Sequence, residues 1–130
     1  MGLHFSKYHG LGNDYLVYDC QKNDHSLTDT EVRRICHRNF GLGSDGILVG
    51  PLWEGERIGV RIFNPDGSEA EKSGNGARIF ARYLKDAGYV RTDECELQTR
   101  GGSVHVQYLD AEGKNLTLGM GRLSFWSETV

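Results

Sequence analysis

The stretch from Ala77 to Ala87 is the feature that most constrains how this chain can fold. Apolar residues recur there at helical spacing without a helix breaker, and Gly88 follows at the position where helices commonly end. The apolar residues cover more than one face of the predicted helix: they are Ala77, Ile79, Phe80, Ala81, Leu84 and Ala87. A helix of this kind needs other elements around it, so we expect it to be largely buried.

The rest of the chain predicts strands and one further helix. Short apolar runs or apolar alternation, both typical of strands, occur at residues 3–8, 15–18, 47–49, 58–63, 94–99, 103–109 and 115–118. Thr28 and Glu31 have the spacing of a capping box, which predicts a helix over residues 29–38. A loop is predicted at 51–56, and turns at 64–67 and 101–102. This mixed order, in a chain of 130 residues, favours one α+β domain over strict βαβ alternation.

Charge and composition exclude several classes of function. The chain has 15 Lys and Arg against 18 Asp and Glu, so it lacks the basic character expected of a sequence-independent nucleic-acid binder. It contains no run of about 18 apolar residues, and we expect no membrane span. Three widely spaced cysteines and five histidines indicate neither a disulfide framework nor a metal site. We therefore expect a protein of the reducing cytoplasm.

A cluster of glycines before the apolar helix indicates a binding site. The segment SGNG at 73–76 places backbone N–H groups at the helix N-terminus, where they and the helix dipole favour an anion such as a carboxylate or a phosphate. Ser73 would lie at the mouth of that site. The alternative is that Ser73 or Asn75 serves only as a helix N-cap.

Two asparagines at strand ends extend this hypothesis. Asn64 follows a predicted strand nine positions before Ser73, and Asn13 lies between Gly12 and Asp14 in another glycine-rich segment. Loops at strand ends often carry ligand sites, and an amide side chain both donates and accepts hydrogen bonds. Each asparagine can alternatively be a turn residue. Together they suggest a polar pocket suited to the ammonium and carboxylate groups of an amino acid.

Four segments carry a resemblance to a known family: HGLGNDY, RNFGLGSDGI, RIFNPDGSEAE and SGNGARIFARYL. In their order and spacing they resemble the N-terminal half of diaminopimelate epimerases, from about Phe5 to Met120. The resemblance implies two pseudo-symmetric α+β domains, each with a curved mixed sheet wrapped around a central helix, and an active site in the cleft between them. Residues 1–130 would then be the N-terminal domain, and the C-terminal domain is absent.

The resemblance also implies a reaction that uses no cofactor. Family members invert the α-carbon of an amino acid without pyridoxal phosphate or metal. One cysteine thiolate removes the α-proton from one face, and a second thiol returns a proton to the other. The implied activity is conversion of LL- to meso-diaminopimelate, in lysine and peptidoglycan biosynthesis. The implied partners are a small amino-acid substrate, the C-terminal domain and a second copy in a homodimer.

Positions that match the family's motifs give the candidate residues. Asn13 and Asn64 match substrate-binding asparagines, whereas Gly74 and Asn75 match the donors that hold the substrate carboxylate. Ser73 takes the position of the first catalytic cysteine. Gly46 takes the position of a glutamine that contacts substrate in some members.

The serine at position 73 changes the expected chemistry. A hydroxyl stays protonated where a thiol titrates near pH 8.5, so Ser73 alone is no strong base. The second cysteine would belong to the absent domain, and we expect little activity from this chain by itself. A fragment, an engineered change and a natural serine variant would each explain the sequence. Two other functions stay open: an amino-acid-binding domain without a base, and a serine variant that dehydrates hydroxy-amino acids.

Overall fold

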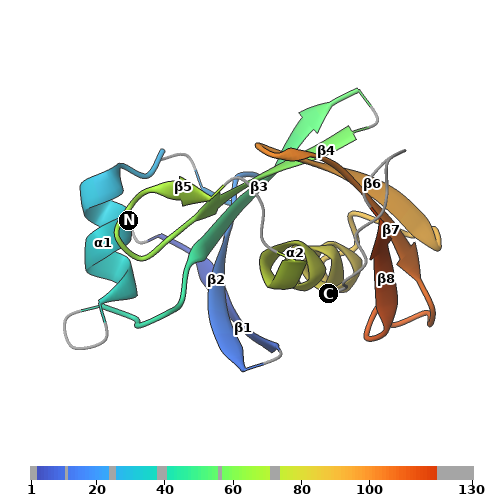
Figure 1. The fold of residues 1–130 in the computed structure, drawn as a ribbon, viewed down its shortest axis with the longest axis horizontal. Helices are drawn as coiled ribbons and strands as arrows, with labels where there is room; N and C mark the ends of the chain where they lie inside the picture. The colour runs from blue at the N-terminus through green and yellow to red at the C-terminus, as the bar shows by residue number, and fades with distance from the viewer. Residues whose placement is uncertain are drawn as a thin grey trace.

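A computed structural model of the chain describes residues 3–10, 12–23, 26–37, 41–55, 57–70 and 74–119. Neither described helix has the length and apolar character that crossing a lipid bilayer requires. The elements follow one another as β1 (Phe5–Gly10), β2 (Asn13–Asp19), α1 (Asp29–Cys36), β3 (Ile47–Glu54), β4 (Arg57–Phe63), β5 (Glu69–Ala70), α2 (Gly74–Asp86), β6 (Glu94–Thr99), β7 (Gly102–Tyr108) and β8 (Leu116–Gly119) (Figure 1).

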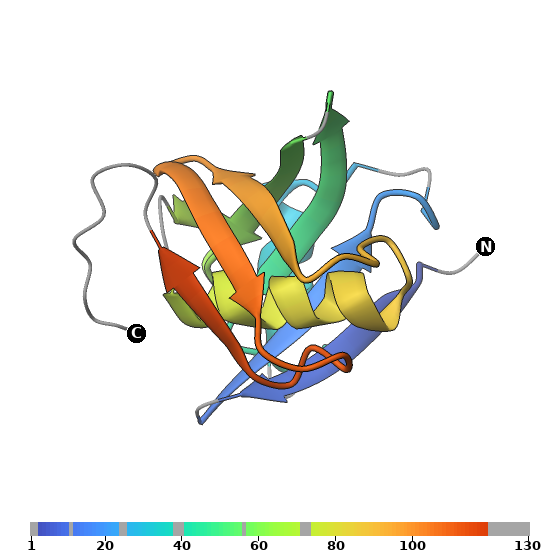
Figure 2. The ribbon, with the colours of Figure 1, turned by 90° about the vertical axis from the view of Figure 1, so that its right-hand side faces the viewer.

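The strands form one mixed sheet that curves around helix α2 (Figure 1, Figure 2). Their order is β1-β2-β3-β4-β6-β7-β8, and β5 pairs with β4 outside this path. The pairs β2–β3 and β4–β6 are parallel, and the other pairs are antiparallel. Both edge strands, β1 and β8, contact α2. The predicted α+β fold, a curved mixed sheet wrapped around a central helix, is therefore confirmed.

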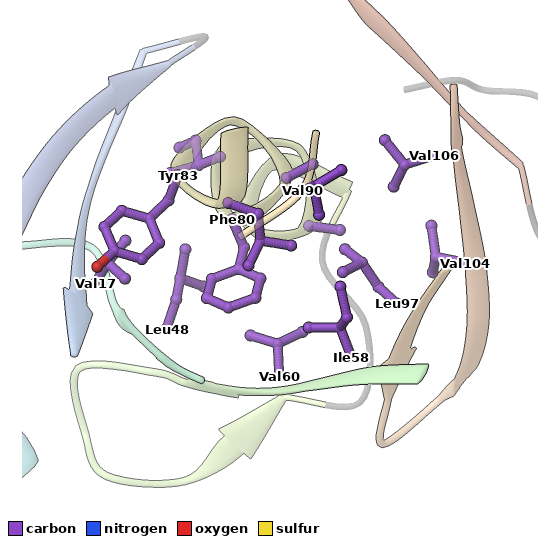
Figure 3. Close-up of a cluster of buried hydrophobic side chains, with 14 of the residues drawn as sticks. Val17, Leu48, Ile58, Val60, Phe80, Tyr83, Val90, Leu97, Val104 and Val106 are labelled. Atoms are coloured by element: carbon purple, nitrogen blue, oxygen red, sulfur yellow. The ribbon is translucent and has the colours of Figure 1, made fainter. Parts of the chain in front are cut away.

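The space between α2 and the sheet holds the main hydrophobic core (Figure 3). Phe80 of α2 is fully buried, and burial of a side chain of this size stabilises a fold by about 1.5–3 kcal/mol. Buried residues from six strands pack in the same core, among them Val17, Leu48, Ile58, Val60, Leu97, Val104, Val106 and Leu116. The predicted burial of this helix is confirmed.

A second cluster lies on the outer face of the sheet, against α1. Successive side chains of a strand point to opposite faces, so Leu16 and Tyr18 of β2 pack with α1 while Val17 packs in the main core. Val32 and Cys36 of α1 complete the contact. Strand β2 is thus buried on both faces, which explains why its sequence is a continuous apolar run.

Local signals predicted both helices to within a few residues. The capping box of α1 is present: Oγ1 of Thr28 accepts from the backbone N of Glu31 at 3.2 Å, and a Glu31 carboxylate oxygen accepts from the backbone N of Thr28 at 2.9 Å. Helix α1 ends at Cys36, two residues before the predicted end. Helix α2 begins at Gly74, three residues before the predicted start, and Gly88 follows it at φ +82° as expected.

The predicted loop at residues 51–56 is wrong. Strand β3 continues to Glu54 and pairs with β4 along residues 52–54. Pro51 falls in a register shift between Val49 and Leu52, where a missing backbone N–H does not interrupt the ladder. Residues 52–54 are a strand because β4 pairs with them; the sequence predicts the β4 strand at 58–63 but not this pairing.

Candidate functional site

One end of the sheet gathers the predicted site residues. Strands β2 and β3 are parallel and both begin at this end, whereas β4 is antiparallel to β3 and ends there. Asn13 is the first residue of β2, and Asn64 follows the last residue of β4. Strand register, not sequence order, therefore brings these two asparagines to the same side of the domain.

A hydrogen bond joins this end of the sheet to the start of α2. Nδ2 of Asn75 donates to Oδ1 of Asn13 at 2.6 Å, although the two residues are 62 positions apart. Both residues are partly buried. Gly74 precedes Asn75 as the first residue of the helix. The structure thus brings together three of the predicted residues: Asn13, Gly74 and Asn75.

The start of α2 has the electrostatic character of an anion site. Its first turn contains no acidic residue, so no carboxylate of that turn neutralises the positive end of the helix dipole. A carboxylate placed there would meet the backbone N–H groups of a helix N-terminus. Ser73, the predicted catalytic position, lies outside the described residues.

Asp45 is a residue of this end that the sequence analysis missed. Its Oδ2 accepts from the backbone N of Asp14 at 2.7 Å and from Nδ2 of Asn13 at 3.4 Å. Asp14 in turn holds the exposed His9, whose Nδ1 lies 2.6 Å from Oδ1 of Asp14. The sequence signal that could have found Asp45 is a carboxylate inside the glycine-rich segment 41–46.

Asn64 lies at the same end of the sheet, but its side chain forms a hydrogen bond within the turn that Asn64 begins. Nδ2 of Asn64 donates to Oγ of Ser68 at 3.0 Å, and the carbonyl of Asn64 accepts from the backbone N of Gly67 at 2.9 Å. Hydrogen bonds from the Ser68 hydroxyl and backbone N–H hold the pKa of Asp66 below its usual range. The predicted turn at 64–67 is confirmed, and the exposed Asn64 has the contacts of a turn residue.

Gly46 has no room for a side chain. A Cβ atom there would lie 2.6 Å from the carbonyl oxygen of Phe63 and 2.8 Å from Cε1 of Tyr15. The glutamine that the resemblance places at this position would therefore need β4 or the Tyr15 ring to shift. In this chain the carbonyl of Gly46 instead accepts from the backbone N of Leu16 at 3.1 Å.

Two of the three cysteines, Cys20 and Cys95, lie at the opposite end of the sheet. Cys20 follows the far end of β2, about 23 Å from Asn13 for seven residues at about 3.3 Å each. Cys36, the last residue of α1, lies nearer the site: it is buried, and Oγ of Ser44, the residue before Asp45, donates to its sulfur at 3.3 Å. Cys95 lies in β6, which runs parallel to β4 and begins at the opposite end of the sheet from Asn64. Burial raises the pKa of the Cys20 and Cys95 thiols, so both are protonated at neutral pH.

A cavity of about 890 Å³ lies where β4 and β6 begin, at the end of the sheet opposite Asn13. Trp53, Ile58, Tyr89 and His105 are among its lining residues. Within the described ranges, no three His, Cys, Asp or Glu side chains are grouped as metal ligands. The contacts around Asn13 and Asn75 are the candidate amino-acid site because they lie at the start of α2, where the helix dipole favours an anion.

A family model for diaminopimelate epimerase matches residues 5–126 of the chain. The chain belongs to the diaminopimelate epimerase family. Diaminopimelate epimerase 2 from Nostoc sp. is 54% identical over 129 residues, which cover 98% of this chain and 45% of that protein. Diaminopimelate epimerase from Moorella thermoacetica is 43% identical over 114 residues, which cover 86% of this chain and 40% of that protein. This diaminopimelate epimerase homologue thus spans less than half the length of these relatives.

Solved structures show the same fold. A hydroxyproline epimerase from Agrobacterium vitis, solved with trans-4-hydroxy-L-proline bound, superposes with a TM-score of 0.69 at 17% identity, covering 89% of this chain and 40% of that one. A phenazine biosynthesis protein of the PhzF family from Bacillus anthracis gives 0.58 at 21% identity, covering 91% and 38%. The resemblance identified from the sequence motifs is confirmed at the level of family and fold.

Proposed function

We propose that this chain is the N-terminal domain of a two-domain, cofactor-independent amino-acid epimerase that acts on diaminopimelate. It would form one wall of the active-site cleft, and a C-terminal domain would form the other. The observation that carries the proposal is the Asn75–Asn13 hydrogen bond at the start of α2, in a chain whose family membership is established.

The start of α2 would hold the substrate α-carboxylate. Backbone N–H groups of Gly74 and Asn75 lie at the positive end of the helix dipole, and no acidic residue of the first turn competes. The same field would stabilise negative charge as it develops on the α-carbon during proton removal. Asn64 donates one Nδ2 hydrogen to the Ser68 hydroxyl, which leaves the second hydrogen and Oδ1 for substrate.

Proton removal is the step for which this chain is least equipped. Ser73 stands where the family has a cysteine, and a hydroxyl is not ionised near neutral pH. The thiols of Cys20 and Cys95 lie at the opposite end of the sheet and stay protonated because burial raises their pKa. The Cys36 sulfur is buried and accepts from the Ser44 hydroxyl. These observations favour a second candidate, an amino-acid-binding domain that keeps the carboxylate site and lacks a base.

Titration of the ¹⁵N-labelled chain with meso-diaminopimelate tests binding. We expect the backbone amides of Gly74 to Gly76 to shift, while the amide of Gly119 in β8 stays unchanged. Cadaverine, which has two amines and no carboxylate, is the matched ligand and should cause no shift at α2. Shifts of equal size with cadaverine, or no response of α2 to diaminopimelate, would contradict a carboxylate site.

Solvent deuterium exchange separates the two candidates. The epimerase hypothesis expects Ser73→Cys, in a polypeptide that also carries the family's C-terminal domain, to exchange the substrate α-hydrogen faster than the serine form. The binding-domain hypothesis expects both forms to bind diaminopimelate and neither to exchange it. Exchange can be followed by loss of the α-hydrogen signal in ²H₂O.

A further inference from the structure

We infer that Asp45 is a positioning residue of this site: its carboxylate orients the amide of Asn13 and, through Asn13, the amide of Asn75. The inference rests on the proposed function, because the Asn75 amide matters to catalysis or binding only if the start of α2 receives a substrate carboxylate. Asp45 bonds Asn13, which bonds Asn75, so Asp45 itself need not touch the substrate.

The position of the Asp45 carboxylate is fixed by the backbone of β2. The backbone N of Asp45 donates to the carbonyl of Asp14 at 2.7 Å, and Oδ2 of Asp45 accepts from the backbone N of Asp14 at 2.7 Å. This pair of bonds continues the β2–β3 pairing, whose register begins at Leu16 and Ile47. Asp45 is half-buried, and this contact with the main chain of Asp14 restrains its carboxylate.

A carboxylate at this position decides which way the Asn13 amide faces. An asparagine amide has a donor end and an acceptor end of similar size, whereas a carboxylate only accepts. Nδ2 of Asn13 lies 3.4 Å from Oδ2 of Asp45, so Oδ1 of Asn13 is directed to Asn75. Asn75 must then present Nδ2, which it does at 2.6 Å.

The orientation of Asn75 has a consequence for an anion at the helix start. Its Nδ2 carries two hydrogens, and donation of one to Asn13 leaves the second for a substrate carboxylate. In the reversed orientation the carbonyl oxygen of Asn75 would take the place of that donor and would repel the carboxylate. Through its bond to Asn13 and the bond of Asn13 to Asn75, Asp45 therefore keeps the Asn75 amide in the orientation that suits an anion.

Wild-type chain allows a direct test of the orientation. A scalar coupling across the hydrogen bond, from ¹⁵Nδ2 of Asn75 to ¹³Cγ of Asn13, is expected in a labelled sample. Absence of this coupling, with both side chains assigned, would overturn the inference. This measurement requires no variant to fold and no substrate to bind.

The variant Asp45→Ala tests the role of the carboxylate. Alanine at 45 removes the oxygen that accepts from Nδ2 of Asn13 and so permits the reversed orientation. We expect hydrogen exchange at Asn75 Nδ2 to accelerate about tenfold and the affinity for meso-diaminopimelate to fall about tenfold. Asp110→Ala is the matched control, since Asp110 also accepts from a backbone N and from an asparagine Nδ2, but in the turn before β8. The control should leave both readouts unchanged.

The conservative variant Asp45→Asn separates positioning from a role of the charge. Its amide oxygen can accept from the backbone N of Asp14 and from Nδ2 of Asn13, as Oδ2 of Asp45 does. We expect slow exchange at Asn75 Nδ2 and an affinity within about threefold of wild type, whereas a role that needs the charge at position 45 predicts the same loss as Asp45→Ala.

The two hypotheses fail in different ways. If the backbone amides of α2 in the wild-type chain do not shift with diaminopimelate, the proposed function is wrong. The scalar coupling and the hydrogen-exchange rates then still test whether Asp45 orients Asn13 and Asn75. If the amides respond but Asp45→Ala matches wild type in exchange and affinity, the positioning role is wrong and the proposed function stands.

Discussion

The hydroxyl of Tyr83, on the central helix, donates to Oδ2 of Asp19 at the end of β2. Asp19 is 3% exposed, and its carboxylate also accepts from Oη of Tyr89 at 2.9 Å and from the backbone N of Gln21 at 2.8 Å. At the other end of the same strand, Asn13 accepts from Asn75. Helix α2 therefore runs alongside β2 in the same direction and is tied to it at both ends, which fixes where the helix N-terminus lies.

The Tyr83–Asp19 contact should contribute measurably to stability. A hydrogen bond to a buried charged group is worth about 1.5–3 kcal/mol, so Tyr83→Phe should lower the free energy of unfolding by about 2 kcal/mol in urea titrations. Tyr89→Phe should cost less, because Tyr83 still donates. The double variant should lose more than the sum of the two, since it removes the last tyrosine donor from a buried carboxylate. Strict additivity would contradict this description of Asp19.

Stability should fall at alkaline pH because these tyrosines ionise later in the folded state. Burial, and then donation to Asp19, raise the pKa of Tyr89 to about 12 and that of Tyr83 further, from an ordinary value near 10. The unfolded chain releases these protons first, so the stabilisation is complete below about pH 10 and is lost as pH rises through the folded-state values. Urea midpoints should fall more steeply between pH 9 and about pH 11 for wild type than for Tyr83→Phe with Tyr89→Phe. Parallel curves would show that ionisation of Tyr83 and Tyr89 is not the cause.

Asn75 and Asn64 should differ in their importance for ligand binding by this chain. Asn75→Ala removes the contact to Asn13 and a donor beside the helix N-terminus, so we expect about tenfold weaker binding of meso-diaminopimelate. Asn64→Ala should change the affinity less than about threefold, because Asn64 is exposed in a turn and does not lie at the start of α2. Calorimetric or NMR titration of both variants measures the difference. A larger loss for Asn64→Ala would show that Asn64, and not Asn75, is the more important substrate contact.

Close packing at Gly50 predicts a large effect of a single methyl group. A Cβ atom there would lie 2.7 Å from Cζ of Phe80 and 2.9 Å from the carbonyl oxygen of Gly59. Gly50→Ala should therefore lower the free energy of unfolding by about 1–3 kcal/mol through overpacking. Gly119→Ala in β8 is the matched control, because nothing lies within 4 Å of its added Cβ. Equal stability of the two variants in urea would contradict the close contact between β3 and α2.

Short-range signals determined the elements that position the site. The capping box of Thr28 and Glu31, the apolar pattern of 77–87 and the glycine at 88 depend on residues within a few positions of one another, so the sequence predicts both helices and most strands. The four glycine-rich motifs predicted the family, the curved sheet around a central helix, and the neighbourhood of Asn13, Gly74 and Asn75. Each of these patterns expresses local backbone geometry or a motif read along the chain.

The tertiary structure alone decided which polar groups meet. Three contacts depend on strand register or on chain segments far apart in sequence: the pairing of β3 beyond Pro51, the bond of Asn13 to Asn75 across 62 positions, and the bond from the backbone N of Asp14 to Asp45. The bond of Asn64 to Ser68 is local, but the local sequence does not distinguish a turn residue from a ligand-site residue. An asparagine or aspartate has the same local preferences for a turn, a cap or a ligand site. The role of each side chain is determined by its burial and by the hydrogen-bonding groups that the fold places near it, because a buried polar group needs a hydrogen-bond partner.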